Sequence, residues 1–185
     1  MDARIIKTKN KIKEGLLDIL QTKRLNEVSI SEICEKARVN RNTFYAHFAT
    51  PEAVIDEIAE DYLTEQYGLF NNCTTTKDVV VTACKHIMRH ANKNIILLKN
   101  RPLHSFIKRG VEYGTNTPIY VIDNSEKQYT EKELKTIQTY IVSGAVAIIM
   151  EWLYSGMQEM PEEVGERVDF INSALVAGIN QSSKA

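Results

Sequence analysis

The chain has 185 residues, 43% of them hydrophobic and 25% charged, which is ordinary for a soluble globular protein of one or two small domains. Its net charge of −1 argues, over the chain as a whole, against a nucleic-acid partner. The longest apolar run is "AVAIIM" (145–150), too short for a membrane helix, and three cysteines without CxxC spacing indicate reduced thiols, so we expect a cytoplasmic protein with no membrane partner.

Helical periodicity predicts an all-α chain. Apolar side chains recur at helical spacing in most of the sequence, and turn formers separate the periodic segments. A β-like "IYVI" at 119–122 is the one weak exception, inside a segment (114–129) that we expect to be a loop. The predicted helices span residues 3–22, 29–37, 41–48, 51–67, 77–92, 94–100, 102–113, 130–156 and a last segment after Pro161.

Capping residues mark several of these helix starts. Ser29 has Glu32 three residues later, which is the spacing of a capping box. Thr50 and Pro51 are an N-cap residue and a residue suited to the first helical position. Thr130 is placed to cap the long helix that ends at Gly156.

The stretch "VNRNTFYAHFATPEAV" (39–54) combines many hydrogen-bonding side chains with the apolar anchors Phe44 and Phe48. A helix that enters the major groove of DNA needs one apolar face against its protein and one polar face toward phosphates and base edges. The charges agree, because residues 1–50 hold ten basic and six acidic residues, a net of +4, while the rest holds 13 and 18, a net of −5. The alternative, a helical hairpin with a merely solvated polar face, explains neither pattern.

The segment "LNEVSISEICEKARVNRNTFYAHFATPEAVIDEI" (25–58) resembles the DNA-binding segment of the TetR/AcrR family of transcriptional regulators. The resemblance implies an N-terminal three-helix helix-turn-helix domain (1–50), a connecting helix (51–68) and a larger helical domain for effector binding and dimerisation (69–185). Many members carry lysine where this chain has Pro51, so we look to Lys7, Lys11 or Thr50 for a replacement phosphate contact. The predicted DNA-binding residues are Lys7, Ser29, Arg41, Asn42, Thr43, Tyr45, His47 and Thr50.

The resemblance also implies a homodimer and a small-molecule effector. Small residues of the 130–156 helix and an apolar stripe with 4-3-4-4 spacing in the last helix fit packing within one chain, whereas the resemblance implies that they form an antiparallel four-helix contact between two subunits. Aromatic and methionine side chains at helical spacing are the candidates for an effector pocket, although such residues more often belong to a core. The predicted interface residues are Gly144, Ala147, Val164, Val168, Ile171, Leu175 and Ile179, and the pocket candidates are Met88, Phe106, Tyr113, Tyr140 and Trp152.

A histidine pair and two cysteines are better explained by packing or solvation than by metal binding or redox sensing. His86 and His90 lie four residues apart and are able to bind a metal, but no carboxylate or cysteine cluster accompanies them in the sequence, so we predict packed or solvated histidines and no metal. Cys73 and Cys84 are candidates for redox sensing, with packed neutral thiols as the default.

The sequence therefore predicts a DNA-binding regulator, and not an enzyme, because it has no GxSxG, HExxH or glycine-rich phosphate loop. We expect a repressor that binds a palindromic operator as a homodimer, needs no cofactor and is released by a small effector. The alternative is a helix-turn-helix regulator that acts through a protein partner or as an activator, without a small ligand.

Overall fold

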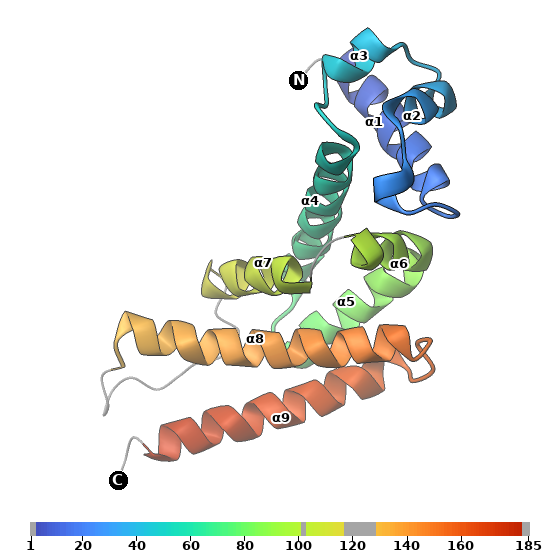
Figure 1. The fold of residues 1–185 in the computed structure, drawn as a ribbon. Helices are drawn as coiled ribbons and strands as arrows, with labels where there is room; N and C mark the ends of the chain where they lie inside the picture. Colours follow the sequence, from blue (N-terminus) through green and yellow to red (C-terminus); the bar gives the residue numbers. More distant parts are fainter. Residues whose placement is uncertain (1–2, 101–102, 117–128, 183–185) are drawn as a thin grey trace. The chain divides into compact units, whose positions relative to one another are not determined.

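The computed structural model describes residues 3–100, 103–116 and 129–182, and within these ranges the chain is helical without a strand (Figure 1). The all-α prediction is confirmed. The β-like "IYVI" lies outside the described residues. The elements in chain order are α1 (Ala3–Ile19), η1 (Leu25–Glu27), α2 (Ile30–Ala37), α3 (Arg41–Tyr45), α4 (Pro51–Leu69), η2 (Phe70–Asn72), α5 (Thr76–Arg89), α6 (Ala91–Asn100), α7 (Leu103–Asn116), α8 (Glu131–Tyr154) and α9 (Pro161–Ser182).

Predicted and observed helices differ mainly at their ends. The third helix closes at Tyr45, three residues before the predicted end, because the chain turns there toward the buried Phe48. The seventh continues to Asn116, three residues into the segment predicted as a loop. A capping box at Thr75 and Asp78, which the sequence analysis did not single out, starts α5.

The chain forms two compact units. The first comprises Met1–Glu65 together with Ala91–Pro102, and the second comprises Gln66–His90 together with Leu103–Ala185. The helix α4 thus begins in the first unit and ends in the second. The predicted boundaries at 50 and 68 remain a prediction.

In the first unit, α1 packs on α2 at Gly15, where an added Cβ would lie 3.2 Å from the backbone nitrogen of Ala37. Ion pairs join α1 to α4: the Lys9 ammonium lies 2.5 Å from the Glu57 carboxylate, and Lys13 lies 2.7 Å from Glu57 and 2.5 Å from Asp61. The core between these helices is apolar and includes Ile12, Leu16, Ile33, Phe44, Val54 and Ile55.

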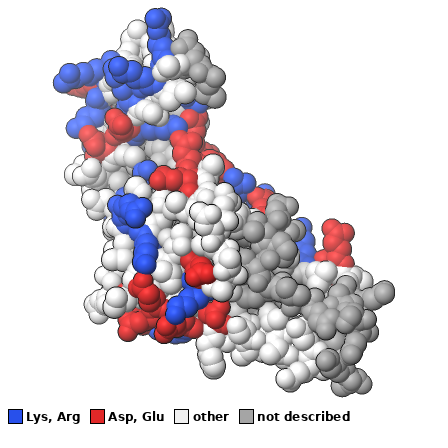
Figure 2. All heavy atoms as spheres, turned by 180° about the vertical axis from the view of Figure 1, so that it is seen from behind, with Lys and Arg blue, Asp and Glu red and all other residues white. Residues whose placement is uncertain are grey.

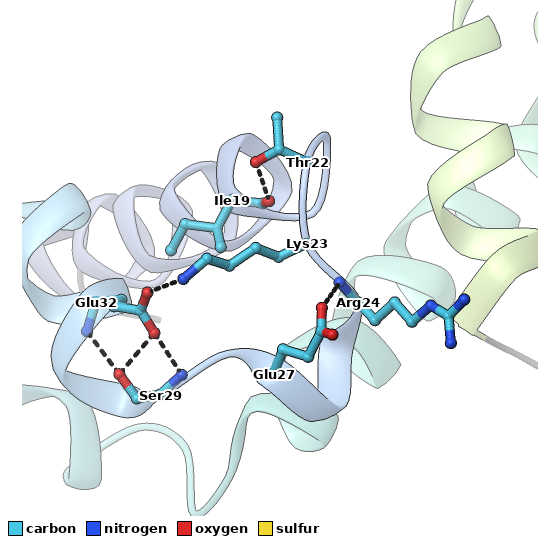
Figure 3. Close-up of polar contacts among 7 residues, drawn as sticks. All are labelled: Ile19, Thr22, Lys23, Arg24, Glu27, Ser29 and Glu32. Carbon is cyan, nitrogen blue, oxygen red and sulfur yellow. Dashed lines mark hydrogen bonds and ion pairs between the residues drawn. The ribbon is translucent and has the colours of Figure 1, made fainter.

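The start of α2 is held by the predicted capping box (Figure 3). The Ser29 hydroxyl oxygen accepts from the backbone N–H of Glu32 at 3.3 Å, and the Glu32 carboxylate accepts from the backbone N–H of Ser29 at 2.9 Å. Lys23 donates to the same carboxylate. This ion pair, followed by the bonds from Ser29, lowers the pKa of Glu32 from 4.5 to about 2.

In the second unit, α9 packs along α5 and beside α8, and α7 packs on α8 (Figure 1). Gly165 permits the close approach of α9 to α5, because a Cβ there would lie 2.6 Å from Cγ2 of Val81 and 3.2 Å from the carbonyl oxygen of Lys77. The turn between α8 and α9 is closed by Trp152, whose indole N–H donates to the carbonyl of Glu159 at 2.9 Å.

We predict opposite stability effects for two glycine-to-alanine substitutions. Gly165→Ala should lower the free energy of unfolding by about 1–3 kcal/mol, because its Cβ overpacks the α5–α9 contact. Gly68→Ala, in the exposed part of α4 with nothing within 4 Å of the added Cβ, should raise it by about 0.5–1 kcal/mol through helix propensity. Urea unfolding measures both, and a stabilised Gly165→Ala would show that α9 does not lie this close to α5.

A second prediction concerns acid. Since the pKa of Glu32 is lowered on folding, its contribution to stability is complete above pH 4.5 and is lost as the pH falls toward about 2. The stability difference between wild type and Glu32→Gln should therefore shrink over this range, as followed by urea unfolding at a series of pH values. Glu35→Gln, which removes a carboxylate from the same helix outside the capping box, is the control. A difference that stays constant with pH would contradict the prediction.

Candidate nucleic-acid interface

The segment α2–turn–α3 has the geometry of a helix-turn-helix. The turn passes through Arg38, whose left-handed backbone (φ 55°) ends α2. Asn40 then caps α3, with its side-chain oxygen accepting from the backbone N–H of Thr43 at 2.7 Å. Local chain geometry thus reverses direction within three residues and starts the second helix of the motif.

One face of α3 is anchored in the protein. Phe44 is fully buried and Phe48 is 4% exposed, with their ring centroids 6.1 Å apart. The Lys9 ammonium lies 5.2 Å from the centroid of the Phe48 ring, a cation–π contact from α1. These contacts orient the rest of α3, because a five-residue helix has little stability of its own.

The opposite face presents polar groups to solvent. Arg41, Asn42 and Tyr45 are exposed, and Thr43 and His47 are half-buried. The Tyr45 hydroxyl, one turn later, interacts with the Arg41 guanidinium and raises the pKa of Arg41. An arginine that is held in this way is pre-oriented for bidentate contact with a phosphate or a guanine edge.

Three other predicted residues lie around this face in different roles. The Ser29 hydroxyl donates to Glu32 at 2.8 Å, so its hydrogen is committed to the capping box. The Thr50 oxygen accepts from the backbone N–H of Ala53 at 3.2 Å and caps α4, which leaves its own O–H as a donor. Lys7 is exposed on α1.

Basic side chains gather over α1, α2 and α3 (Figure 2). This cluster coincides with the unit that carries the polar face of α3, and it is the distribution expected of a surface for a polyanion. The net charge of the whole chain conceals it.

The five candidates for an effector pocket are scattered over the second unit. Met88 and Tyr140 are 47% and 70% exposed, whereas Phe106 and Trp152 are buried. Tyr113 stacks on Tyr67 with ring centroids 4.9 Å apart, and Phe70 packs on its edge. Helical spacing does not reveal this aromatic cluster, because Tyr67 and Phe70 lie far from Tyr113 in the sequence. Which residues line a pocket stays a prediction.

The predicted dimer residues separate into two groups. Gly144, Ala147 and Ile171 lie on the exposed surface of α8 and α9, and Leu175 and Ile179 are half-buried. Val164 and Val168, in contrast, are 0% and 1% exposed within their own chain, so the expectation that they face a partner is corrected. The reason is that the first half of α9 turns its apolar stripe toward α5.

The outer surface of α8 and α9 is nevertheless apolar. Phe170 and Tyr154, not singled out from the sequence, are 75% and 68% exposed. Among the described helices, α8 also has the length and composition to cross a membrane, with only 22% of its most apolar stretch buried, which by itself is weak evidence for such a span. A shallow groove of about 350 Å³ between the two helices is lined by Tyr140, Ser143, Gly144, Ala145, Ile148, Val168, Ile171 and Asn172.

Cys84 is a packed thiol, as expected. Burial raises the pKa of Cys84 to about 12 and also raises the pKa of Cys34. Neither is a reactive thiolate at neutral pH. Cys73 is half-buried, with its sulfur 3.5 Å from the Thr82 hydroxyl.

Known proteins with similar sequences are bacterial regulators. The HTH-type transcriptional regulator YxbF of Bacillus subtilis is 23% identical over 168 residues, which cover 85% of this chain and 42% of that protein. The regulator YvdT of the same organism is 39% identical over 54 residues, which cover 29% of this chain and 28% of that protein. The chain thus spans less than half the length of these curated relatives.

Solved structures show the same fold. A TetR transcriptional regulator from Streptococcus agalactiae 2603V matches with a TM-score of 0.69 and 19% identity, covering 92% of this chain and 96% of that one. The dihydroxyacetone kinase operon activator DhaS matches with a TM-score of 0.62 and 18% identity over the same shares.

The family comparison covers the C-terminal part of the chain, outside the segment 25–58 that carries the sequence resemblance. The TetR model described as "Transcriptional regulator C-terminal region" matches residues 74–172, more than half of the chain. The helix-turn-helix resemblance, the fold and this match agree: the chain belongs to the TetR family of transcriptional regulators.

Proposed function

We propose that this protein binds double-stranded DNA through the exposed face of α3 and regulates transcription from the cytoplasm. The observation that carries the proposal is the two-sided construction of α3, with Phe44 buried beneath and Arg41, Asn42 and Tyr45 exposed above. The basic surface over α1–α3 supplies the sequence-independent attraction to phosphates. The side chains on α3 supply the contacts to base edges.

The binding unit that we propose is a two-fold dimer formed through α8 and α9. Their outward surface carries large apolar side chains that a monomer leaves in water, among them Phe170 and Ile171. The small residues Gly144 and Ala147 allow another helix to lie close. Two α3 helices about 34–36 Å apart in such a dimer would address successive major grooves of a palindromic operator.

Regulation by a small molecule is proposed as a population shift. An effector that binds the second unit favours a domain arrangement whose two α3 helices fit the operator badly, so affinity falls. The helix α4 is the natural coupling element, since it begins in the first unit and ends in the second.

Repression is the sign that we propose, and activation is the alternative. DhaS, which shares the fold, is named an operon activator, and this name supports activation as the alternative. Loss of a repressor raises expression from the bound promoter, whereas loss of an activator lowers it.

The first test is a DNA-binding titration on the region upstream of the protein's own gene, at two salt concentrations. Wild type should bind saturably, with a dissociation constant on the order of 1–100 nM that rises with salt. Arg41→Ala and Tyr45→Ala should each weaken binding by about 5- to 150-fold, the equivalent of about 1–3 kcal/mol.

Lys99→Ala is the matched control for Arg41→Ala, because it removes the same charge from another exposed position of the first unit. It should bind like wild type. Equal losses in the two variants would mean that only net charge matters, and sequence-independent binding that neither variant changes would overturn the assignment of α3.

The second test concerns the dimer. Ile171→Glu should convert the dimer to a monomer and weaken operator binding, because two-fold symmetry brings two carboxylates into one apolar interface. Met88→Glu is the control, since Met88 on α5 is also 47% exposed but lies outside α8 and α9. Sedimentation velocity reports the mass, and a dimeric Ile171→Glu would contradict the proposed interface.

A further inference from the structure

His86 of α5 and His90, the residue that caps the end of this helix, lie together in the second unit. His86 is 1% exposed and His90 is half-buried, and their ring centroids are 4.7 Å apart with the rings tilted by 58°. His90 follows His86 by four positions, about one helical turn, which brings the two imidazoles together at the end of α5. From the sequence alone we expected each to be packed or solvated; the structure shows a contacting pair.

The distance between the rings suits a shared ion. Ligand nitrogens of the pair lie within 4.8 Å of one another. Two imidazole nitrogens that bind one Zn²⁺ at about 2.0–2.1 Å stand about 3.3 Å apart in tetrahedral geometry. The bound of 4.8 Å includes this separation, and the partial exposure of His90 provides an entry path.

The donor type selects the class of ion. Imidazole suits Zn²⁺, Cu²⁺, Ni²⁺ and Co²⁺, whereas Mg²⁺ and Ca²⁺ require oxygen ligands. Cys84 does not face the pair, because side chains two positions apart on a helix lie on different faces.

We propose that His86 and His90 form a binding site for a divalent late transition-metal ion. The two side chains supply two ligands, and water or a small anion completes the coordination. A site with open positions exchanges its ion more readily than a closed four-ligand structural site. The proposal does not depend on DNA binding, and its test uses no DNA.

The test is a titration of the full chain with Co²⁺, followed by visible absorption and by competition with a chelating indicator. Wild type should bind one ion per chain, with stronger d–d absorption than the hexaaqua ion and without thiolate charge-transfer bands. His90→Gln should weaken binding at least about tenfold, because loss of a ligand costs no less than loss of an outer-shell partner.

His47→Gln is the matched control, since it removes a histidine from the first unit and should leave Co²⁺ affinity unchanged. His86→Gln should weaken binding as well, and far-UV circular dichroism checks that this buried substitution leaves the helices intact. If His86→Gln does not fold, His90→Gln decides alone. The proposal is overturned if His90→Gln binds like wild type, or if the spectrum stays that of the hexaaqua ion.

Discussion

The burial of Phe44 and Phe48 is the constraint on which the surface that we propose for DNA binding depends. A helix of five residues does not persist alone, so the direction of its polar side chains follows from the two rings beneath it. Lys9 connects this anchor to the rest of the first unit, because its ammonium lies over the Phe48 ring and also pairs with Glu57 of α4. Lys9 thereby links the buried Phe48 ring to the helix α4.

The polar residues around α3 divide between building the motif and facing outward. Asn40, Ser29 and Thr50 place their oxygens on backbone N–H groups at helix starts, where four donors lack intrahelical partners. Arg41 and Tyr45 lie on the exposed face and interact with each other. The polar residues of this segment therefore form two groups, one that caps helices and one that faces outward. We assign DNA recognition mainly to the outward-facing group.

The second unit depends on the approach of α9 to α5 at Gly165. This approach turns Val164 and Val168 into the core of their own chain and leaves Phe170 and Ile171 outside. The apolar surface that we assign to a second copy thus keeps Ile171 from the predicted stripe and loses Val164 and Val168. Helices with apolar residues on two sides present this ambiguity, because spacing identifies a face but not its partner.

Local chemistry determined what the sequence alone revealed: the helices, the caps at Ser29, Thr50 and Thr130, and the family resemblance of the helix-turn-helix. The caps depend on residues within about one helical turn of each other, and the helices and the resemblance depend on spacing along one continuous segment, so all of them are readable from the sequence. Tertiary structure alone decided the burial of Val164, the stacking of Tyr67 on Tyr113 and the side on which α9 meets α5. Each of these is a contact between segments distant in the sequence, and one chain carries no local signal for such pairings.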